Sequence, residues 1–97
     1  MNFIDLNAQV RRSDAWKSTV LARIGDANIK VMRMDGTSYP DESHDYSEGL
    51  LVIDGHLNLI VESKPIIVKS GEMYIVPVGV VHSVASGSLG TLVIFDV

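Results

Sequence analysis

The stretch from Gly36 to Gly55 decides the fold, and it reads GTSYPDESHDYSEGLLVIDG. Three of its side chains, those of Glu42, His44 and Glu48, are of the kinds that bind divalent metal ions. They stand at positions i, i+2 and i+6. Successive side chains of an extended chain point to opposite faces, so this spacing predicts that all three point to the same side.

An apolar strand follows these side chains. Leu50–Ile53 is a continuous apolar run, and the parity of a strand places Glu48 on the same inward face as Leu50 and Val52. A carboxylate buried there without a cation would be costly, and a metal ion or a protonated histidine would remove that cost. The run ends in Asp54-Gly55, a dipeptide typical of a tight hairpin turn.

Short strands separated by turn residues account for the chain from residue 19 onward. Clusters of Gly, Pro, Asp and Ser divide it into eight apolar or alternating segments, which predict an all-β sandwich or barrel. The expected strands are 19–24, 28–35, 42–53, 56–61, 65–68, 72–76, 80–85 and 90–96.

The chain is expected to have two parts, an N-terminal arm over residues 1–18 and a single β-barrel domain over residues 19–97. In the arm, Ser13-Asp14-Ala15-Trp16 is expected to open a helical turn, with Ser13 as its candidate cap. A loosely packed leader, anchored by Phe3 and Trp16, is an equal alternative.

Composition excludes several classes of function. The 97 residues carry 8 basic and 12 acidic side chains, a net charge of −4, with no basic stripe to indicate a nucleic-acid or anionic membrane partner. Because there is no cysteine, a metal site would use histidine and carboxylate ligands. The longest apolar run has four residues, against the roughly 18 of a membrane-spanning helix. The first residues lack the pattern of a signal peptide, so a cytoplasmic location is expected.

A second set of spaced residues lies towards the C-terminus. Gly71 is followed after five residues by Pro77-Val78-Gly79, and His82 comes two residues later. The Pro-x-Gly tripeptide predicts a tight turn that delivers His82 to the mouth of the barrel. Proline fixes its own φ, and glycine relieves the steric strain of the turn because it has no Cβ.

The two sets resemble the two motifs of the cupin family. The first motif of that family is Gly, five residues, His-x-His, three or four residues, Glu, six residues and Gly. The second is Gly, five residues, Pro-x-Gly, two residues, His, three residues and Asn. Eight positions match: Gly36, His44, Glu48, Gly55, Gly71, Pro77, Gly79 and His82. The resemblance implies a double-stranded β-helix, which is a jelly-roll barrel.

Two positions depart from the motifs. Glu42 stands where the first histidine is expected, and Ser86 stands where the asparagine is expected. Cupins that bind metal present three histidines and one glutamate, so the resemblance implies that the metal ligands here would be Glu42, His44, Glu48 and His82. Such a set suits Mn²⁺, Fe²⁺, Ni²⁺ or Zn²⁺, and ligand type does not choose among them. Four protein ligands would leave an octahedral ion two open positions for water or substrate.

Several alternatives stay open at the level of sequence. A shift of one residue would turn Asp41 inward in place of Glu42 and would remove His44 from the site. His56 is interpreted as a solvent-facing residue just after the expected turn. A further group of side chains belongs either to a pocket or to the core: Met32, Met34, Tyr39, Tyr46, Tyr74 and Phe95.

The resemblance supports three functional hypotheses, since one fold serves many activities. The first is a small metal-dependent enzyme, an isomerase, lyase or oxygenase, that acts on a small polar organic molecule. The second is a metal-free cupin that binds or senses a small molecule without catalysis, and the third is a cupin whose pocket is only packed core. Arginine is absent after Arg33, which disfavours phosphosugar substrates unless Lys30 or Arg33 reaches the pocket. The exposed strand edges of so small a barrel predict a homodimer.

Overall fold

The structure, a computed structural model, describes residues 2–97. Within these residues, one short helix precedes eight strands, and turns occupy the glycine-containing sites at 25–26, 70–71 and 78–79, as predicted. The elements are α1 (Leu6–Arg11), β1 (Thr19–Ile24), β2 (Ala27–Asp35), β3 (Tyr39–Glu42), β4 (Glu48–Val61), β5 (Lys64–Lys69), β6 (Met73–Val76), β7 (His82–Val84) and β8 (Leu89–Asp96).

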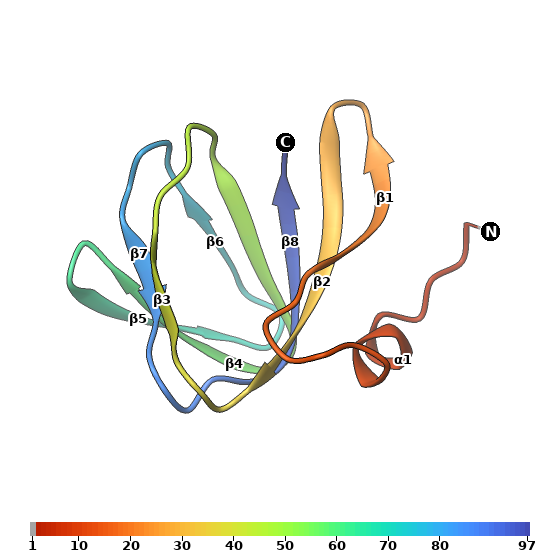
Figure 1. Ribbon diagram of the computed structural model, residues 1–97, viewed down its shortest axis with the longest axis horizontal. Coiled ribbons are helices and arrows are strands. Elements are labelled where there is room, and N and C mark those ends of the chain that lie inside the picture. Colours follow the sequence, from red (N-terminus) through yellow and green to blue (C-terminus); the bar gives the residue numbers. More distant parts are fainter. Residues whose placement is uncertain (1) are drawn as a thin grey trace.

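The strands form one antiparallel sheet in the order β1-β2-β8-β4-β7-β3, and β5 and β6 also pair with β4. Figure 1 shows that this sheet curls, so that β3 and β7 lie across the molecule from β1 and β2. Within residues 2–97, β3 pairs with β7 and has no backbone pairing to β2. The all-β barrel predicted from the sequence is therefore confirmed, with one side that the sheet itself does not close.

The hairpin predicted at Asp54-Gly55 is wrong, because β4 runs through this dipeptide as one long, bent strand (Figure 1). Gly55 has φ +81° and lies directly opposite Gly90 of β8. A Cβ atom on Gly55 would lie 1.9 Å from the carbonyl oxygen of Leu89. Glycine is thus needed for a bulge where two backbones approach closely, and not for a chain reversal.

The two faces of the sheet carry separate apolar clusters. Leu50 and Val52 of β4 point into the barrel, and they pack there with residues of β8 such as Leu92. Outward-facing residues of the same strands, including Val93, pack with Val10 of α1. Alternation along β4 places Glu48 on the inner face with Leu50 and Val52, as predicted, where it is buried.

The N-terminal segment differs from both sequence alternatives. The helix lies earlier than expected, at Leu6–Arg11, and its cap is Asp5, whose carboxylate accepts a hydrogen bond from the Ala8 amide at 3.0 Å. Phe3 is 83% exposed and anchors nothing, whereas Trp16 packs against the inner core. Among the described residues, no helix has the length and apolar character needed to cross a membrane.

Candidate metal centre

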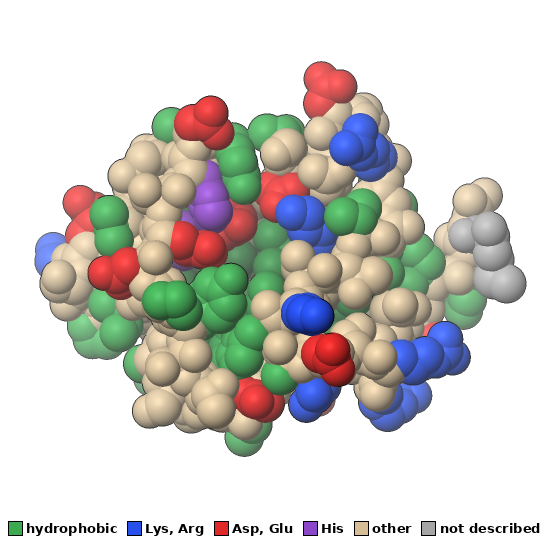
Figure 2. All heavy atoms as spheres, viewed as in Figure 1, with side chains coloured by type: hydrophobic (Ala, Val, Ile, Leu, Met, Phe, Trp, Pro, Cys, Tyr) green, Lys and Arg blue, Asp and Glu red, His purple; other side chains and the backbone are tan. Residues whose placement is uncertain are grey.

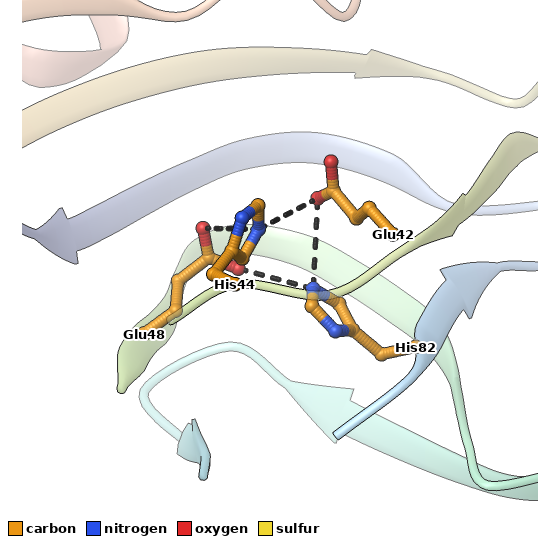
Figure 3. A group of neighbouring side chains, drawn as sticks. All are labelled: Glu42, His44, Glu48 and His82. Carbon is orange, nitrogen blue, oxygen red and sulfur yellow. Dashed lines mark hydrogen bonds and ion pairs between the residues drawn. The ribbon is translucent and has the colours of Figure 1, made fainter. Parts of the chain in front are cut away.

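Four side chains converge at one end of the barrel interior (Figure 3). Glu42 ends β3, Glu48 begins β4, His82 begins β7, and His44 lies in the loop between β3 and β4. We call these four residues the His/Glu cluster. One ligand atom from each lies within 4.8 Å of the others.

The spacing in sequence grouped these four residues for an incomplete reason. The single strand expected over 42–53 is wrong, because residues 43–47 form a loop. Of the three cluster residues in the first motif, Glu42 and Glu48 lie on strands and His44 does not. Glu42 is brought to His82 by sheet pairing, since the two are register partners between β3 and β7. His44 then reaches the same point from the loop.

His82 is held by a hydrogen bond that fixes which of its nitrogens faces the cluster. Its Nδ1 lies 3.0 Å from the carbonyl oxygen of Val80, which can only accept, so Nδ1 carries the proton. In the neutral imidazole, Nε2 therefore presents a lone pair to the oxygens of Glu48 at 3.2 Å and Glu42 at 3.5 Å. Two lone pairs at this distance require a proton or a cation between them.

His44 shows the same requirement more directly. Its Nε2 lies 3.5 Å from Glu42 Oε1 and 3.6 Å from Glu48 Oε2. Among residues 2–97, it is the buried side-chain nitrogen or oxygen that has no hydrogen-bond partner. Buried polar atoms are nearly always satisfied, so an unpaired one among three candidate ligands is the kind of atom that a metal ion satisfies.

Two neighbours orient His44. Its ring stacks on Tyr46, with centroids 4.9 Å apart and planes 11° apart. Its carbonyl oxygen accepts a hydrogen bond from the Gly79 amide at 2.8 Å. The turn over residues 77–80 therefore supports both histidines, because Val80 also holds the ring of His82. The sequence predicted the role of this turn for His82 and missed its role for His44.

Burial dominates the electrostatics of the cluster. It raises the pKa of the Glu48 carboxyl above its ordinary value, and a positive charge on His44 or His82 would lower that pKa in part. Burial also raises the pKa of the Tyr46 phenol, and the nearby carboxylates of Asp96 and Glu48 add to this effect. A cation in the cluster would favour the ionised form of Glu48.

The other sequence candidates lie outside the His/Glu cluster. Asp41, the alternative in the shifted register, is exposed. His56 is half-buried on β4 and is not among the four residues. Lys30 forms an ion pair of 2.7 Å with the buried carboxylate of Asp96.

A small cavity lies on the inner side of the cluster. Its volume is about 40 Å³, and Glu42, Glu48 and His82 form part of its wall. Met32 and Tyr39 line it, as two of the pocket candidates from the sequence, and Trp16 lines it without having been predicted to do so. The sequence indicated Trp16 only as an anchor of the N-terminal segment, because it lies outside both motifs.

A much larger apolar groove, of about 690 Å³, lies on the outer face of the sheet. Leu51, Met73, Ile75 and Phe95 line it, so Phe95 belongs to this outer groove and not to the interior pocket. None of the four His/Glu cluster residues lines the groove, so the groove is not the candidate metal site although it is larger than the interior cavity. The homodimer expected from the sequence stays a prediction, and this groove is the surface that would suit it.

Comparison with known proteins agrees with the fold. The model of the cupin domain family matches residues 30–97. A cupin-2 domain containing protein from Shewanella frigidimarina superposes with a TM-score of 0.87 and 24% identity, covering 96% of this chain and 92% of that one. No curated protein matches the chain.

Two further structures show how widely the architecture is used. A hydroquinone 1,2-dioxygenase from Sphingomonas, with 4-hydroxybenzoate bound, has a TM-score of 0.82 at 12% identity, covering 97% of this chain and 74% of that one. A putative mannose-6-phosphate isomerase from Ralstonia eutropha has a TM-score of 0.80 at 17% identity, covering 98% and 96%. At such low identity these likenesses concern the fold alone.

Proposed function

Because the chain belongs to the cupin domain family, whose model matches residues 30–97, we propose that the His/Glu cluster binds a divalent metal ion and presents it to a small polar organic ligand. The observation that carries the proposal is the buried, unpartnered Nε2 of His44. A metal ion would satisfy this atom and the lone pair of His82 Nε2 together.

The spacing and charge of the donors fit such an ion. Ligand atoms that share an ion at about 2.1 Å lie about 3 to 4 Å apart. The four nitrogen–oxygen distances of 3.2 to 3.6 Å are in this range. Two carboxylates would balance the charge of a dication, and the nitrogen and oxygen donors suit Mn²⁺, Fe²⁺, Ni²⁺ or Zn²⁺.

Each part of the chain would have a distinct task. The Val80 carbonyl would keep the metal-facing nitrogen of His82 unprotonated, and the burial of Glu48 would exclude water from one side of the ion. A bound divalent ion supplies Lewis acidity, which polarises an oxygen of the ligand. The same site would serve an enzyme or a sensor, and a screen for turnover separates them: ligand-induced thermal stabilisation without product would assign a sensing role.

A metal-free binding module is the second candidate, and a specific contact favours it. A protonated His82 would donate from Nδ1 to Val80 and from Nε2 to Glu48, so both of its nitrogens would be satisfied without metal. This state leaves His44 Nε2 without a hydrogen bond, because both carboxylates lie 3.5 Å or more from it. The metal-bound state is therefore the better account of the whole cluster.

Elemental analysis of the purified, untagged protein tests the proposal. We expect close to one equivalent of metal per chain, either as purified or after incubation with Mn²⁺, Fe²⁺, Ni²⁺ or Zn²⁺. In Glu42→Ala we expect weaker binding than in the unmodified protein but retained metal, because Glu42 is the most exposed member of the cluster, at 36%. Absence of metal under all these conditions would refute the proposal in favour of the metal-free module.

A further inference from the structure

The cavity beside the cluster is too small for most organic molecules. At about 40 Å³ it has room for only a few water molecules, since a cavity needs about 10 to 15 Å³ of such space to hold one. Apart from the cluster residues, its walls are mainly apolar and include Leu57 and Leu92. A ligand that reached the metal from this side would be limited by these walls.

One wall comes from outside the sheet. The Trp16 ring packs against Tyr39 of β3, with ring centroids 5.5 Å apart. Trp16 itself is tied to β2, because its amide donates to the carbonyl of Arg33 at 2.9 Å. Since β2 and β3 are not paired with each other within residues 2–97, Trp16 and Tyr39 together bridge the side of the barrel that the sheet leaves open.

The figures agree with this placement. Figure 1 shows the segment between α1 and β1 crossing over β2. Figure 2 shows a hollow in the same face, with histidine and acidic side chains on one side of it and hydrophobic side chains within it. A ligand that entered through this hollow would approach the cluster from solvent.

Trp16 is held in place by more than packing. Its indole Nε1 donates to Asp35 Oδ1 and to Thr37 Oγ1, both at 2.8 Å. Hydrogen bonds from Thr37 and from Trp16 hold the pKa of the Asp35 carboxyl below its usual value, so it is an ionised acceptor at neutral pH. Arg33 adds a bond from its Nε to the carbonyl of Ser13 at 2.9 Å.

The backbone of Trp16 also has an unusual conformation. Its φ is +61°, a conformation that residues other than glycine seldom adopt. Such a conformation persists where surrounding bonds determine it, and here the amide and indole bonds do so. The segment is therefore built to hold the indole at the cavity wall.

We propose that Trp16 sets the size of the ligand: it admits to the metal only oxygen-donor ligands of a few heavy atoms and excludes ring-sized ones. This inference rests on the proposed function, because it concerns access to the ion held by the His/Glu cluster. Small carboxylates are suitable probes, since formate, acetate and benzoate share one metal-binding group and differ in bulk.

The test uses the Co²⁺-loaded protein, whose visible spectrum reports ligand binding at the metal. We expect formate and acetate to change the spectrum of the unmodified protein and benzoate to leave it unchanged at the same concentrations. In Trp16→Ala, benzoate affinity should rise by at least about tenfold, equivalent to about 1.4 kcal/mol, while acetate affinity stays the same. Trp16→Leu, which keeps an apolar side chain of smaller bulk, should give a smaller gain and serves if the alanine variant does not fold.

Phe3→Ala is the matched control, because it removes an aromatic ring from the same segment at a position that is 83% exposed. It should exclude benzoate as the unmodified protein does. Benzoate binding to the unmodified protein as tight as acetate binding would overturn the inference. So would a folded Trp16 variant that binds Co²⁺ and acetate but still excludes benzoate. Failure of the unmodified protein to bind Co²⁺ or any other divalent ion would instead refute the proposed function.

Discussion

His82 and His44 both direct Nε2 towards Glu42 and Glu48, yet the protein holds the two rings in different ways. His82 starts a strand, its side chain is 4% exposed, and a carbonyl oxygen fixes its proton. His44 lies in a loop, its side chain is 20% exposed, and its Nε2 has no hydrogen-bond partner. The strand histidine is thus part of the folded core, whereas the loop histidine contributes to the site and little to the core.

His82→Ala is expected to have the largest effect. Metal affinity should fall by more than about 100-fold, since loss of an outer partner alone costs 10- to 100-fold. The metal-free protein should also lose about 2 to 4 kcal/mol of unfolding free energy, because Glu48 remains buried without its nearest partner. Metal titration and denaturation in a chelator measure the two effects. His56→Ala is the matched control, and full metal binding by His82→Ala would remove His82 from the site.

His44→Ala separates the contribution to metal binding from the contribution to core stability. We expect a large loss of metal affinity, but a change in metal-free stability of no more than about 1 kcal/mol, because the removed nitrogen made no hydrogen bond. Urea denaturation of the two histidine variants, side by side in a chelator, makes the comparison. Equal destabilisation by both substitutions would show that His44 is as much a part of the core as His82.

The same contrast explains which parts of the site could be predicted from the sequence. Spacing predicted the inward placement of Glu48 and His82, because strand parity and the Pro-x-Gly turn are local patterns with local consequences. It also grouped His44 with them, although the extended chain assumed for that grouping is a loop. The orientation of His44 depends on the Gly79 amide, a contact between distant segments that no local pattern contains.

Long-range contacts account for the errors in the fold as well. Asp54-Gly55 has the composition of a hairpin turn, but Gly55 is required because Gly90 of another strand lies against it. Trp16 belongs to a segment that shows no periodicity, and its partners Arg33 and Tyr39 are on other elements. Alternating patterns predicted the strands, whereas contacts between backbones of separate strands could not be predicted from one sequence.

Gly79→Ala tests whether the turn holds the loop histidine. Gly79 and Gly25 have φ values of +75° and +60°, and a Cβ on either would meet no atom within 4 Å. Alanine at each position should therefore cost a similar stability, of about 1 kcal/mol. Alanine keeps the amide of residue 79 that donates to the His44 carbonyl, but its Cβ disfavours the positive φ and would shift this amide. Metal affinity should therefore fall several-fold in Gly79→Ala and stay unchanged in Gly25→Ala, whose amide makes no bond to His44. Isothermal titration with the metal measures this, and equal affinities in the two variants would exclude a positioning role for the turn.

Tyr46 should have the smallest effect, because it acts on the loop histidine through ring stacking alone. Tyr46→Phe keeps the ring that lies 4.9 Å from the His44 ring, and it should leave metal affinity unchanged. Tyr46→Leu removes the stacking partner, and a pair of this kind is worth about 0.5 to 1.5 kcal/mol, so affinity should fall by about two- to tenfold. Competition with a chromophoric chelator resolves changes of this size. If Tyr46→Phe lost as much affinity as Tyr46→Leu, the hydroxyl group would be the part of Tyr46 that holds the site, and His44 would be less dependent on its aromatic neighbour than the stacked geometry indicates.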